Sequence, residues 1–232
     1  MFWTFVDAST ISDGRIVIDG KPGHHLARVR RLRPGEHGVA VSRGREYELE
    51  VVEIQGERVV GRVLGERPTR GEATTPVTLL QAVLPNPDFD AVIEGGTAVG
   101  IHEFVAVQAA RSIGRPPGSR RARWNAIAQS AAEQSHRGDI PQVTGPITLP
   151  AALDRATGTR LFALDPAAAV PLLHAVDGSP AYTIAVGPEG GWTDVELTVL
   201  RARGAVAVNL GPRILRARLA PVVAAAILVQ QR

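Results

Sequence analysis

The sequence contains no cysteine. This absence excludes disulfide bonds, zinc sites built on thiolates and catalysis by a cysteine nucleophile. Six histidines and the carboxylates of Asp and Glu remain as candidate metal ligands. His24 and His25 are adjacent, so on a helix their side chains would diverge by about 100° and could not easily share a metal. We therefore expect no metal site.

Long apolar runs are also missing. No stretch reaches the roughly 18 apolar residues that a membrane-spanning helix needs, and Asp7 and Asp13 interrupt the first residues before they could form a secretory signal. Hydrophobic residues make up 44% of the 232 residues and charged residues 21%, close to the averages of globular proteins that bury a core. We therefore expect a cytoplasmic protein with no membrane partner.

Lysine and aromatic residues are scarce. Lys21 is the only lysine, so nearly all the positive charge behind the formal net charge of +3 sits on guanidinium groups. Guanidinium forks suit phosphate binding, but a GC-rich coding bias would give the same excess of arginine, and that explanation weighs more. Aromatic residues reach only 4%, so extensive stacking of RNA bases on aromatic rings is not supported.

The pattern of apolar residues changes near residues 66–76. Before it, short β-branched segments with glycine turns at 15–20, 37–42, 45–56 and 57–66 predict strands of a small barrel, interrupted by one helical segment at 23–36. The stretch "ERPTRGEATTP" (66–76) has two prolines and little apolar content, as in a linker. From Val77 onward, predicted strands and helices alternate, which predicts a mainly parallel sheet covered by helices on both faces. The predicted helices include "PAAAVPLLHAV" (166–176) and a last helix from about Ala217.

The stretch "YTIAVGPEGGWTDVEL" (182–197) runs from a predicted buried strand through a glycine turn into a helix. Thr193 and Glu196 have the spacing of a capping box at the start of that helix. Ligands bind at the carboxyl ends of strands in open α/β sheets. The two adjacent glycines at 190 and 191 either let the backbone approach such a ligand or simply permit a tight turn, and the segment alone does not decide between the two.

A second loop of the same kind follows a later strand. "GPRILRARLAPVVAAAIL" (211–228) again places Gly-Pro after a strand and before an apolar helix. The pair "VGPEGGWTDVE" and "LGPRILR" resembles the ribosomal small-subunit RNA methyltransferase E family. "HHLARVRRLRPGE", "QAVLP" and "AAEQSHRGDIPQV" resemble further segments of the same family in the same order, so the resemblance covers nearly the whole chain.

The resemblance implies a fold and an activity. It implies a PUA-like β-barrel that binds RNA over residues 1–70 and an α/β methyltransferase domain of the SPOUT superfamily over 71–232, with a C-terminal trefoil knot that holds S-adenosylmethionine. The implied reaction is methylation of N3 of a uridine in 16S rRNA, with the rRNA or the small ribosomal subunit as partner. It also implies a homodimer formed through the region of the last helix, which is apolar nearly all round. The general rarity of knots would not have suggested this fold.

The two Gly-Pro loops supply the candidate cofactor site. Its residues are Leu164, Gly187, Pro188, Glu189, Gly190, Gly191, Leu210, Gly211, Ile214 and Leu215. Uridine N3 carries a proton whose pKa lies well above neutrality, so methyl transfer needs that proton removed or the uracil anion stabilised. Arg213 and Arg216 are the candidate catalytic residues because their charge could stabilise that anion. Either of them could instead grip phosphates or cap a loop by binding carbonyls.

Other arginines are candidates for RNA binding. Arg28, Arg30 and Arg31 lie in the predicted barrel and could contact phosphates, with an ordinary solvated helix face as the alternative. Arg137, near the end of a helix predicted from about residue 120 to 136, is a further candidate. Its neighbour His136 could act as a general base, but a histidine at a helix end more often binds terminal carbonyls.

The chain departs from the family where chemistry is expected. Relatives usually continue with Thr-Glu-Thr after the second loop, whereas Ala217, Arg218 and Leu219 stand here, so a carboxylate is replaced by a cation. A non-catalytic RNA-binding paralogue is therefore a rival hypothesis. A small-molecule enzyme that uses another nucleotide is a second rival, supported only by the glycine loop.

Overall fold

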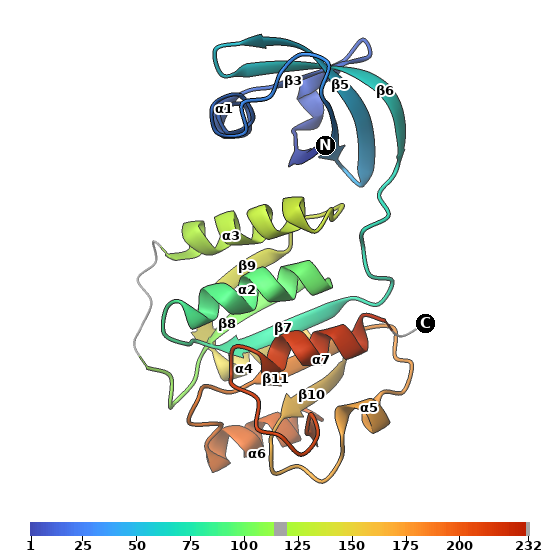
Figure 1. Cartoon of the computed structure of the whole chain (residues 1–232). Helices are drawn as coiled ribbons and strands as arrows, with labels where there is room; N and C mark the ends of the chain where they lie inside the picture. Colours follow the sequence, from blue (N-terminus) through green and yellow to red (C-terminus); the bar gives the residue numbers. More distant parts are fainter. Residues whose placement is uncertain (114–119, 231–232) are drawn as a thin grey trace. The chain divides into compact units, whose positions relative to one another are not determined.

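The computed structural model describes residues 1–113 and 120–230, and the chain divides into two compact units. Unit 1 consists of residues 1–72 together with 132–139, and unit 2 consists of residues 73–131 together with those from 140 onward. Figure 1 draws both units, coloured along the sequence. Each unit has a hydrophobic core of its own.

Unit 1 is built on a six-stranded sheet with the order β1-β4-β5-β6-β3-β2. Only β1 and β4 run parallel, and the other pairs are antiparallel. Its core gathers apolar side chains of the strands and of the short helical segment, among them Phe2, Ile16, Leu26 and Leu49. The elements are β1 (Phe2–Phe5), η1 (Ala8–Thr10), β2 (Ile11–Ser12), β3 (Arg15–Ile18), α1 (Gly20–His24), η2 (His25–Val29), β4 (His37–Ser42), β5 (Arg45–Gln55) and β6 (Arg58–Pro68). Closure of this sheet into the expected barrel stays a prediction.

Unit 2 contains a six-stranded sheet in which every neighbouring pair is parallel, with the order β12-β10-β11-β7-β8-β9. Its strands are β7 (Val77–Ala82), β8 (Glu103–Gln108), β9 (Gln142–Thr148), β10 (Arg160–Leu164), β11 (Tyr182–Val186) and β12 (Val206–Val208). The helical segments are α2 (Asp88–Val99), α3 (Arg120–Gln134), α4 (Leu149–Leu153), η3 (Asp154–Ala156), α5 (Leu172–Ala175), α6 (Asp194–Ala202) and α7 (Ala220–Leu228). The end of α3, from Ala132 onward, belongs to unit 1.

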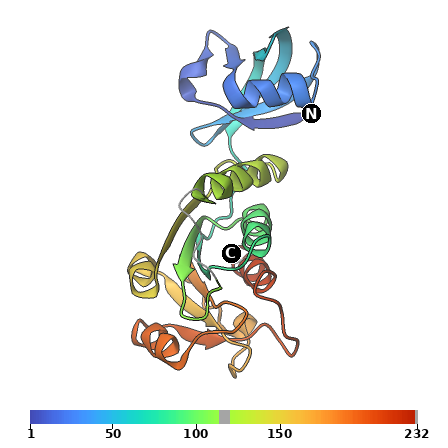
Figure 2. The same ribbon diagram turned by 90° about the vertical axis from the view of Figure 1, so that its left-hand side faces the viewer.

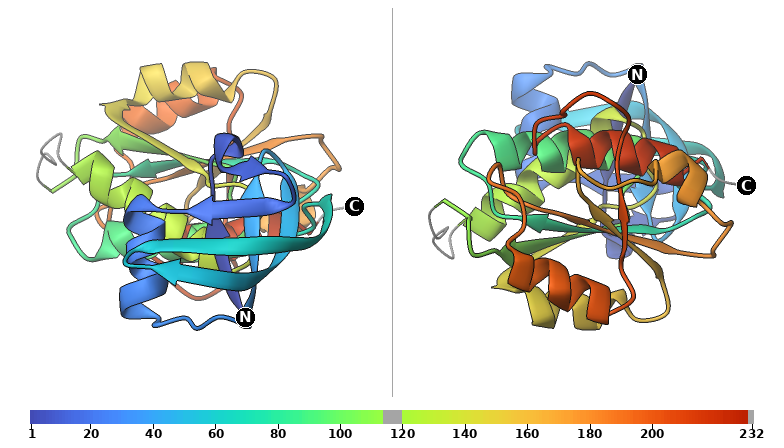
Figure 3. Two further views of the ribbon diagram at one scale, coloured as in Figure 1. Left: turned by 90° about the horizontal axis from the view of Figure 1, so that it is seen from above. Right: turned by 90° about the horizontal axis from the view of Figure 1, so that it is seen from below.

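Helices cover both faces of this sheet, as the alternating pattern predicted. Successive strand residues point to opposite faces, so Leu79 packs in the cluster that contains α2 and α7 while Leu80 packs in the cluster that contains α4 and α6. Figures 2 and 3 show these two helix layers on either side of the sheet. Because all the strands are parallel, the carboxyl ends of β10, β11 and β12 lie at one edge, with Leu164 in register with Val186 and Val208.

Several boundaries differ from those predicted. β6 continues to Pro68 and pairs with β5, so part of the expected linker is strand. The helix expected in "PAAAVPLLHAV" is only α5, which begins after Pro171. β9 was not predicted, because Gly145 and Pro146 interrupt its apolar pattern; it lies at the sheet edge, where such residues are tolerated. The last helix starts at Ala220 rather than near Ala217; residues 217–219 form a turn, in which the N–H groups of Leu219 and Ala220 donate to the carbonyl of Arg216.

Candidate cofactor site

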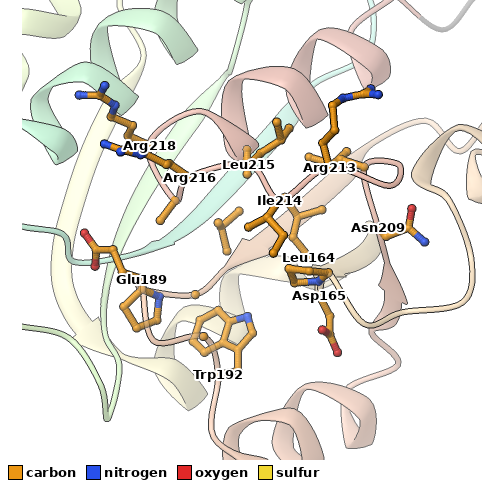
Figure 4. A pocket seen from close by; sticks show the side chains of 18 of the residues that line it. Leu164, Asp165, Glu189, Trp192, Asn209, Arg213, Ile214, Leu215, Arg216 and Arg218 are labelled. Atoms are coloured by element: carbon orange, nitrogen blue, oxygen red, sulfur yellow. The ribbon is translucent and has the colours of Figure 1, made fainter.

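Unit 2 holds a cavity of about 430 Å³ at the carboxyl ends of three neighbouring strands. Leu164, Val186 and Val208 end β10, β11 and β12 and form its base, and the loops that follow these strands form its walls. This volume lies in the range of small-molecule sites, and crevices at this edge are where parallel α/β sheets bind ligands. Figure 4 shows the side chains that line the cavity.

The first wall is the glycine loop between β11 and α6, residues 187–192. The N–H of Gly191 donates to the carbonyl of Pro188 at 2.8 Å and closes a turn, and Gly191 has φ +67°, which favours glycine. The predicted capping box is confirmed: the hydroxyl of Thr193 accepts from the N–H of Glu196, and the Glu196 carboxylate accepts from the N–H of Thr193. The cap fixes where the helix begins and therefore where the loop ends.

The second wall is the loop between β12 and α7, residues 209–219. Asn209 orders its start, because its side-chain oxygen accepts the N–H of Gly211 at 2.9 Å and its amide donates to the carbonyl of Ala168 at 2.8 Å. Gly211 has φ +92°, again a conformation that favours glycine. At the other end, the carbonyl of Arg216 caps the first turn of α7. The loop is thus held at both ends, with Leu210, Ile214 and Leu215 between them.

Three exposed arginines of this second loop line the cavity: Arg213, Arg216 and Arg218. In the view of Figure 4, Arg216 and Arg218 extend to the same side of the cavity and Arg213 extends to the opposite side. Arg218 donates to the carboxylate of Asp88, at the start of α2, at 3.1 Å. The charge of Arg218 is therefore balanced within the site.

Carboxylates complete the lining. Asp165 directly follows β10, and its Oδ1 accepts the N–H of Ala167 at 2.9 Å. Glu189 lies in the glycine loop and is exposed. The cavity thus combines apolar walls with carboxylates and guanidinium groups at its rim. Such a set suits a small ligand that has both apolar and charged or polar parts.

The arginines Arg28, Arg30 and Arg31 lie in unit 1, on η2 and the turn that follows it, and all three are exposed. Arg30 donates to the carbonyl of Met1 at 3.4 Å. Exposure alone does not test a role in phosphate binding, which stays a prediction.

Potential metal ligands do not cluster in the described part of the chain. His24 pairs with Glu57 at 2.8 Å, and no group of three or more potential metal ligands occurs within residues 1–113 and 120–230.

Arg137 was expected to contact RNA, and the structure contradicts this. Its side chain is only 2% exposed and donates to the carboxylate of Glu72 from Nη2 at 2.6 Å and from Nε at 3.2 Å. Burial raises the pKa of Glu72. Hydrogen bonds from Arg137, the charge of Arg137 and hydrogen bonds from the N–H groups of Gly138 and Asp139 lower it by more, so the pKa lies below its ordinary value. Arg137 therefore belongs to the interior of unit 1.

Comparison with known proteins decides which family this architecture represents. The RNA methyltransferase domain family matches residues 71–229, and the RNA methyltransferase PUA domain family matches residues 18–64. The ribosomal RNA small subunit methyltransferase E of Mycobacterium bovis is 35% identical over 230 residues, which cover 95% of this chain and 88% of that protein. This chain belongs to the ribosomal RNA small subunit methyltransferase E family.

Further known proteins agree with this chain in sequence, in fold or in both. The Synechocystis protein of the same name is 32% identical and is matched over 88% of this chain and 69% of its own length. The crystal structure of the Neisseria gonorrhoeae family member, bound to S-adenosyl methionine, superimposes with a TM-score of 0.87 at 28% identity and covers 97% of this chain and 95% of that one. A Legionella pneumophila methyltransferase shares the fold with a TM-score of 0.88 at 21% identity.

The candidate cofactor residues fall on the cavity with one exception. The structure places these residues in its lining: Leu164, Gly187, Pro188, Glu189, Gly191, Leu210, Gly211, Ile214 and Leu215. Gly190 does not line it, and a Cβ built at this position would meet the side chain of Arg111 rather than the cavity. A side chain at Gly190 would therefore point away from the cavity, and a contact between the backbone of Gly190 and the cofactor stays a prediction.

Sequence reasoning missed four polar or aromatic residues of this lining. They are Asp88, Asp165, Trp192 and Asn209. Asp165 and Asn209 carry a recognisable signal, since each directly follows a buried strand at the edge where ligands bind. Asp88 carries no such signal, because its place in the cavity depends on a partner 130 residues away.

None of the helices in residues 1–113 and 120–230 has the length and apolar character that a membrane-spanning helix needs.

Proposed function

We propose that this chain transfers the methyl group of S-adenosylmethionine to N3 of a uridine in 16S rRNA of the small ribosomal subunit. The observation that carries the proposal is the cavity at the ends of β10, β11 and β12, walled by two Gly-Pro loops and edged by arginines. Membership of the family and the S-adenosyl methionine bound to the Neisseria gonorrhoeae member support the choice of cofactor.

The residues of the cavity fit this cofactor. Leu164, Leu210 and Leu215 offer apolar walls for an adenine ring, and Asp165 offers a carboxylate for hydroxyl groups. The backbone of the glycine loop permits close approach at Gly191, where a Cβ would stand in open space. When bound, S-adenosylmethionine supplies an electrophilic methyl group on a sulfonium, so the transfer needs no metal.

The protein's own contribution to the chemistry is position and charge. Removing the N3 proton of uridine leaves negative charge on the uracil, and a fixed positive charge beside it lowers the barrier. Arg216 is the residue we propose for this role, since it lies at the rim and its backbone is held by the cap of α7. Arg213, which extends to the other side of the cavity, is proposed to assist it or to hold a phosphate of the RNA.

The knot and the homodimer belong to the same proposal. The chain passes from β12 at the sheet edge to α7, which packs against α2, β7 and β11 in the middle of the sheet. This return across the ends of β10 and β11 supports the proposed trefoil knot.

Apolar residues on the surface of and before α7 support the proposed homodimer. They are the half-buried apolar residues of α7 itself, Ile214, which is 85% exposed, and Leu219.

RNA docking is proposed for the N-terminal PUA-like domain, residues 1–70, and methyl transfer for residues 71–232. The two family matches, to residues 18–64 and 71–229, support this division. Arg28, Arg30 and Arg31 are exposed and are proposed to bind RNA phosphates. A cytoplasmic location follows from a ribosomal substrate and is part of the proposal.

A non-catalytic RNA-binding paralogue is the second candidate. It is favoured by Ala217, Arg218 and Leu219, which replace the expected Thr-Glu-Thr beside the cavity. The pairing of Arg218 with Asp88 weakens this alternative, because the added cation is neutralised rather than left facing the substrate.

Primer extension on rRNA separates the two candidates. Methylation at N3 blocks Watson–Crick pairing, so reverse transcription stops at the modified uridine. We expect rRNA from cells that lack the gene to lose one stop, and re-introduction of the intact gene to restore it. An unchanged pattern of stops in the deletion strain, with the protein still bound to the small subunit, would instead establish the paralogue.

A further inference from the structure

The glycine loop is held from its outer side by the segment that follows β8. Arg111 donates from Nη1 to the carbonyl of Gly190 at 2.7 Å and to the carbonyl of Trp192 at 3.4 Å. The neighbouring N–H of Ala110 donates to Oε1 of Glu196 at 2.8 Å. Two adjacent residues of this segment therefore grip the loop and the helix start that follows it.

Gly190 shows which side of the loop Arg111 occupies. A Cβ at Gly190 would lie 3.3 Å from Cδ and 3.5 Å from Cβ of Arg111, so the arginine stem packs against this glycine. Glu189 and Gly191, on either side, line the cavity. The loop is thus one backbone layer thick, with the cavity on one side and Arg111 on the other.

Glu196 ties this contact to the capping box. Its Oε2 accepts from the N–H and the hydroxyl of Thr193, both at 2.9 Å, while Oε1 accepts from Ala110. Burial raises the pKa of Glu196, but hydrogen bonds from Thr193 and Ala110 and the charge of Arg111 lower it, with a net shift downward. The carboxylate therefore stays ionised at neutral pH and keeps both contacts.

We propose that Arg111 is a positioning residue that holds the glycine loop in the conformation that binds S-adenosylmethionine. The inference rests on the proposed function and deepens it. Within the loop, the turn is closed by the hydrogen bond from the N–H of Gly191 to the carbonyl of Pro188. A glycine-rich backbone can adopt many other conformations. When only a fraction of molecules has a competent loop, the apparent affinity for the ligand falls by that fraction. Arg111 raises the fraction without touching the ligand.

The test replaces Arg111 by Met, which keeps the aliphatic stem beside Gly190 but removes Nη1, the donor of both hydrogen bonds. We expect the dissociation constant for S-adenosylmethionine, measured by calorimetry, to rise about 10-fold, as when roughly one loop in ten remains competent. Hydrogen exchange of the backbone amides of residues 187–192 should become faster in the protein without cofactor. The turnover rate at saturating cofactor and the affinity for RNA should stay near those of the unaltered protein.

Two further variants make the comparison specific. Arg111→Lys keeps a positive charge and N–H donors on a single nitrogen but lacks the planar guanidinium that fixes their direction, so it should recover part of the lost affinity. Arg203→Met is the matched control, because it removes an exposed arginine paired with Asp154 at 2.7 Å, at the opposite end of α6 from the glycine loop. It should leave cofactor affinity and exchange in the loop unchanged.

Unchanged cofactor affinity and unchanged exchange in the Arg111→Met protein would overturn the inference. A loss of RNA affinity alone would also overturn it, and would make Arg111 a phosphate contact. Failure of the unaltered protein to bind S-adenosylmethionine would instead count against the proposed function, and the exchange measurement would still test the grip of Arg111 on the loop.

Discussion

Replacing Glu72 by Gln removes the negative charge that faces the buried guanidinium of Arg137. In unit 1 that carboxylate accepts four hydrogen bonds, two from Arg137 and one each from the N–H groups of Gly138 and Asp139, at 2.6 to 3.2 Å. The variant removes the carboxylate charge that faces a guanidinium side chain only 2% exposed. Breaking a buried ion pair on one side costs about 3 to 5 kcal/mol.

The lower end of that range applies here. The side chain of Glu72 is 31% exposed, so water already screens part of the interaction. We expect the Glu72→Gln protein to lose about 3 kcal/mol of unfolding free energy in unit 1. For a unit of this size, each kcal/mol lowers Tm by roughly 4 to 8 °C, so its transition should fall by about 12 °C or more.

Differential scanning calorimetry of the full chain measures this shift, and a double-mutant cycle assigns it to the pair. Arg137→Met should cost less than Glu72→Gln, because the carboxylate that it leaves unpaired can still reach water. The double variant should recover part of the loss seen in Glu72→Gln, since it contains no unbalanced buried charge. An unchanged Tm for Glu72→Gln, together with loss of RNA affinity in Arg137→Met, would refute the reasoning and return Arg137 to the RNA-binding surface.

The same pair predicts how stability depends on pH. The pKa of Glu72 is lower in the folded protein than its ordinary value of 4.5, so the unfolded chain binds more protons in acid. The contribution of the pair is therefore complete above pH 4.5 and is lost as the pH falls through the lower folded value. The gap in Tm between the unaltered and Glu72→Gln proteins should close over that acidic range.

Four further predictions concern the cofactor site and its surroundings. Arg216→Ala should lower the rate of single-turnover methylation at saturating RNA by at least ~10-fold, with cofactor affinity nearly kept. The triple change of Arg28, Arg30 and Arg31 to Ala should instead weaken RNA binding and flatten its salt dependence. Equal losses of RNA affinity in both proteins, with no loss of rate, would show that both sets of arginines act on phosphates. Gly191→Val should abolish cofactor binding, measured by calorimetry, because φ +67° forbids a branched side chain. Gly190→Ala should keep cofactor binding, because its Cβ meets only the flexible side chain of Arg111. Equal losses of cofactor affinity in the two variants would contradict the orientation of the loop. Arg218→Ala should change the saturated rate by less than ~3-fold, because Asp88 already balances its charge and exposed ion pairs contribute little; a larger drop would give Arg218 a part in the transfer. Light scattering at micromolar concentration should give the mass of a dimer, and an active monomer would exclude shared sites.

The local patterns of the sequence predicted the elements that local chemistry controls. The capping box at Thr193, the buried strand before it and the two Gly-Pro turns all follow from residues within a few positions of one another. Such signals also placed most of the cavity lining, because the loops after parallel strands necessarily meet at one edge of the sheet. The resemblance to the family added the cofactor and the reaction, which no spacing of residues could provide.

Features that depend on distant partners could not be predicted in this way. Arg137 reads as an exposed cation at a helix end until Glu72, 65 residues earlier, is placed beside it. The sequence around Gly190 suggests a glycine whose Cα faces the ligand. In the structure, the Cα of Gly190 faces Arg111, 79 residues earlier in the chain. In both cases the sequence shows a residue's chemistry correctly and leaves its direction open, because direction is set by tertiary packing.

The lining of the cavity has a consequence for how the protein is made. Apart from Asp88, every residue of that lining lies between positions 164 and 220, in the last third of the chain. A nascent chain emerges from its amino end, so the strands and helices that precede residue 164 can fold before any cofactor could be held. A ligand stabilises only the state that binds it. S-adenosylmethionine would therefore stabilise finished molecules selectively and give chains that stop before Asn209 no protection from degradation.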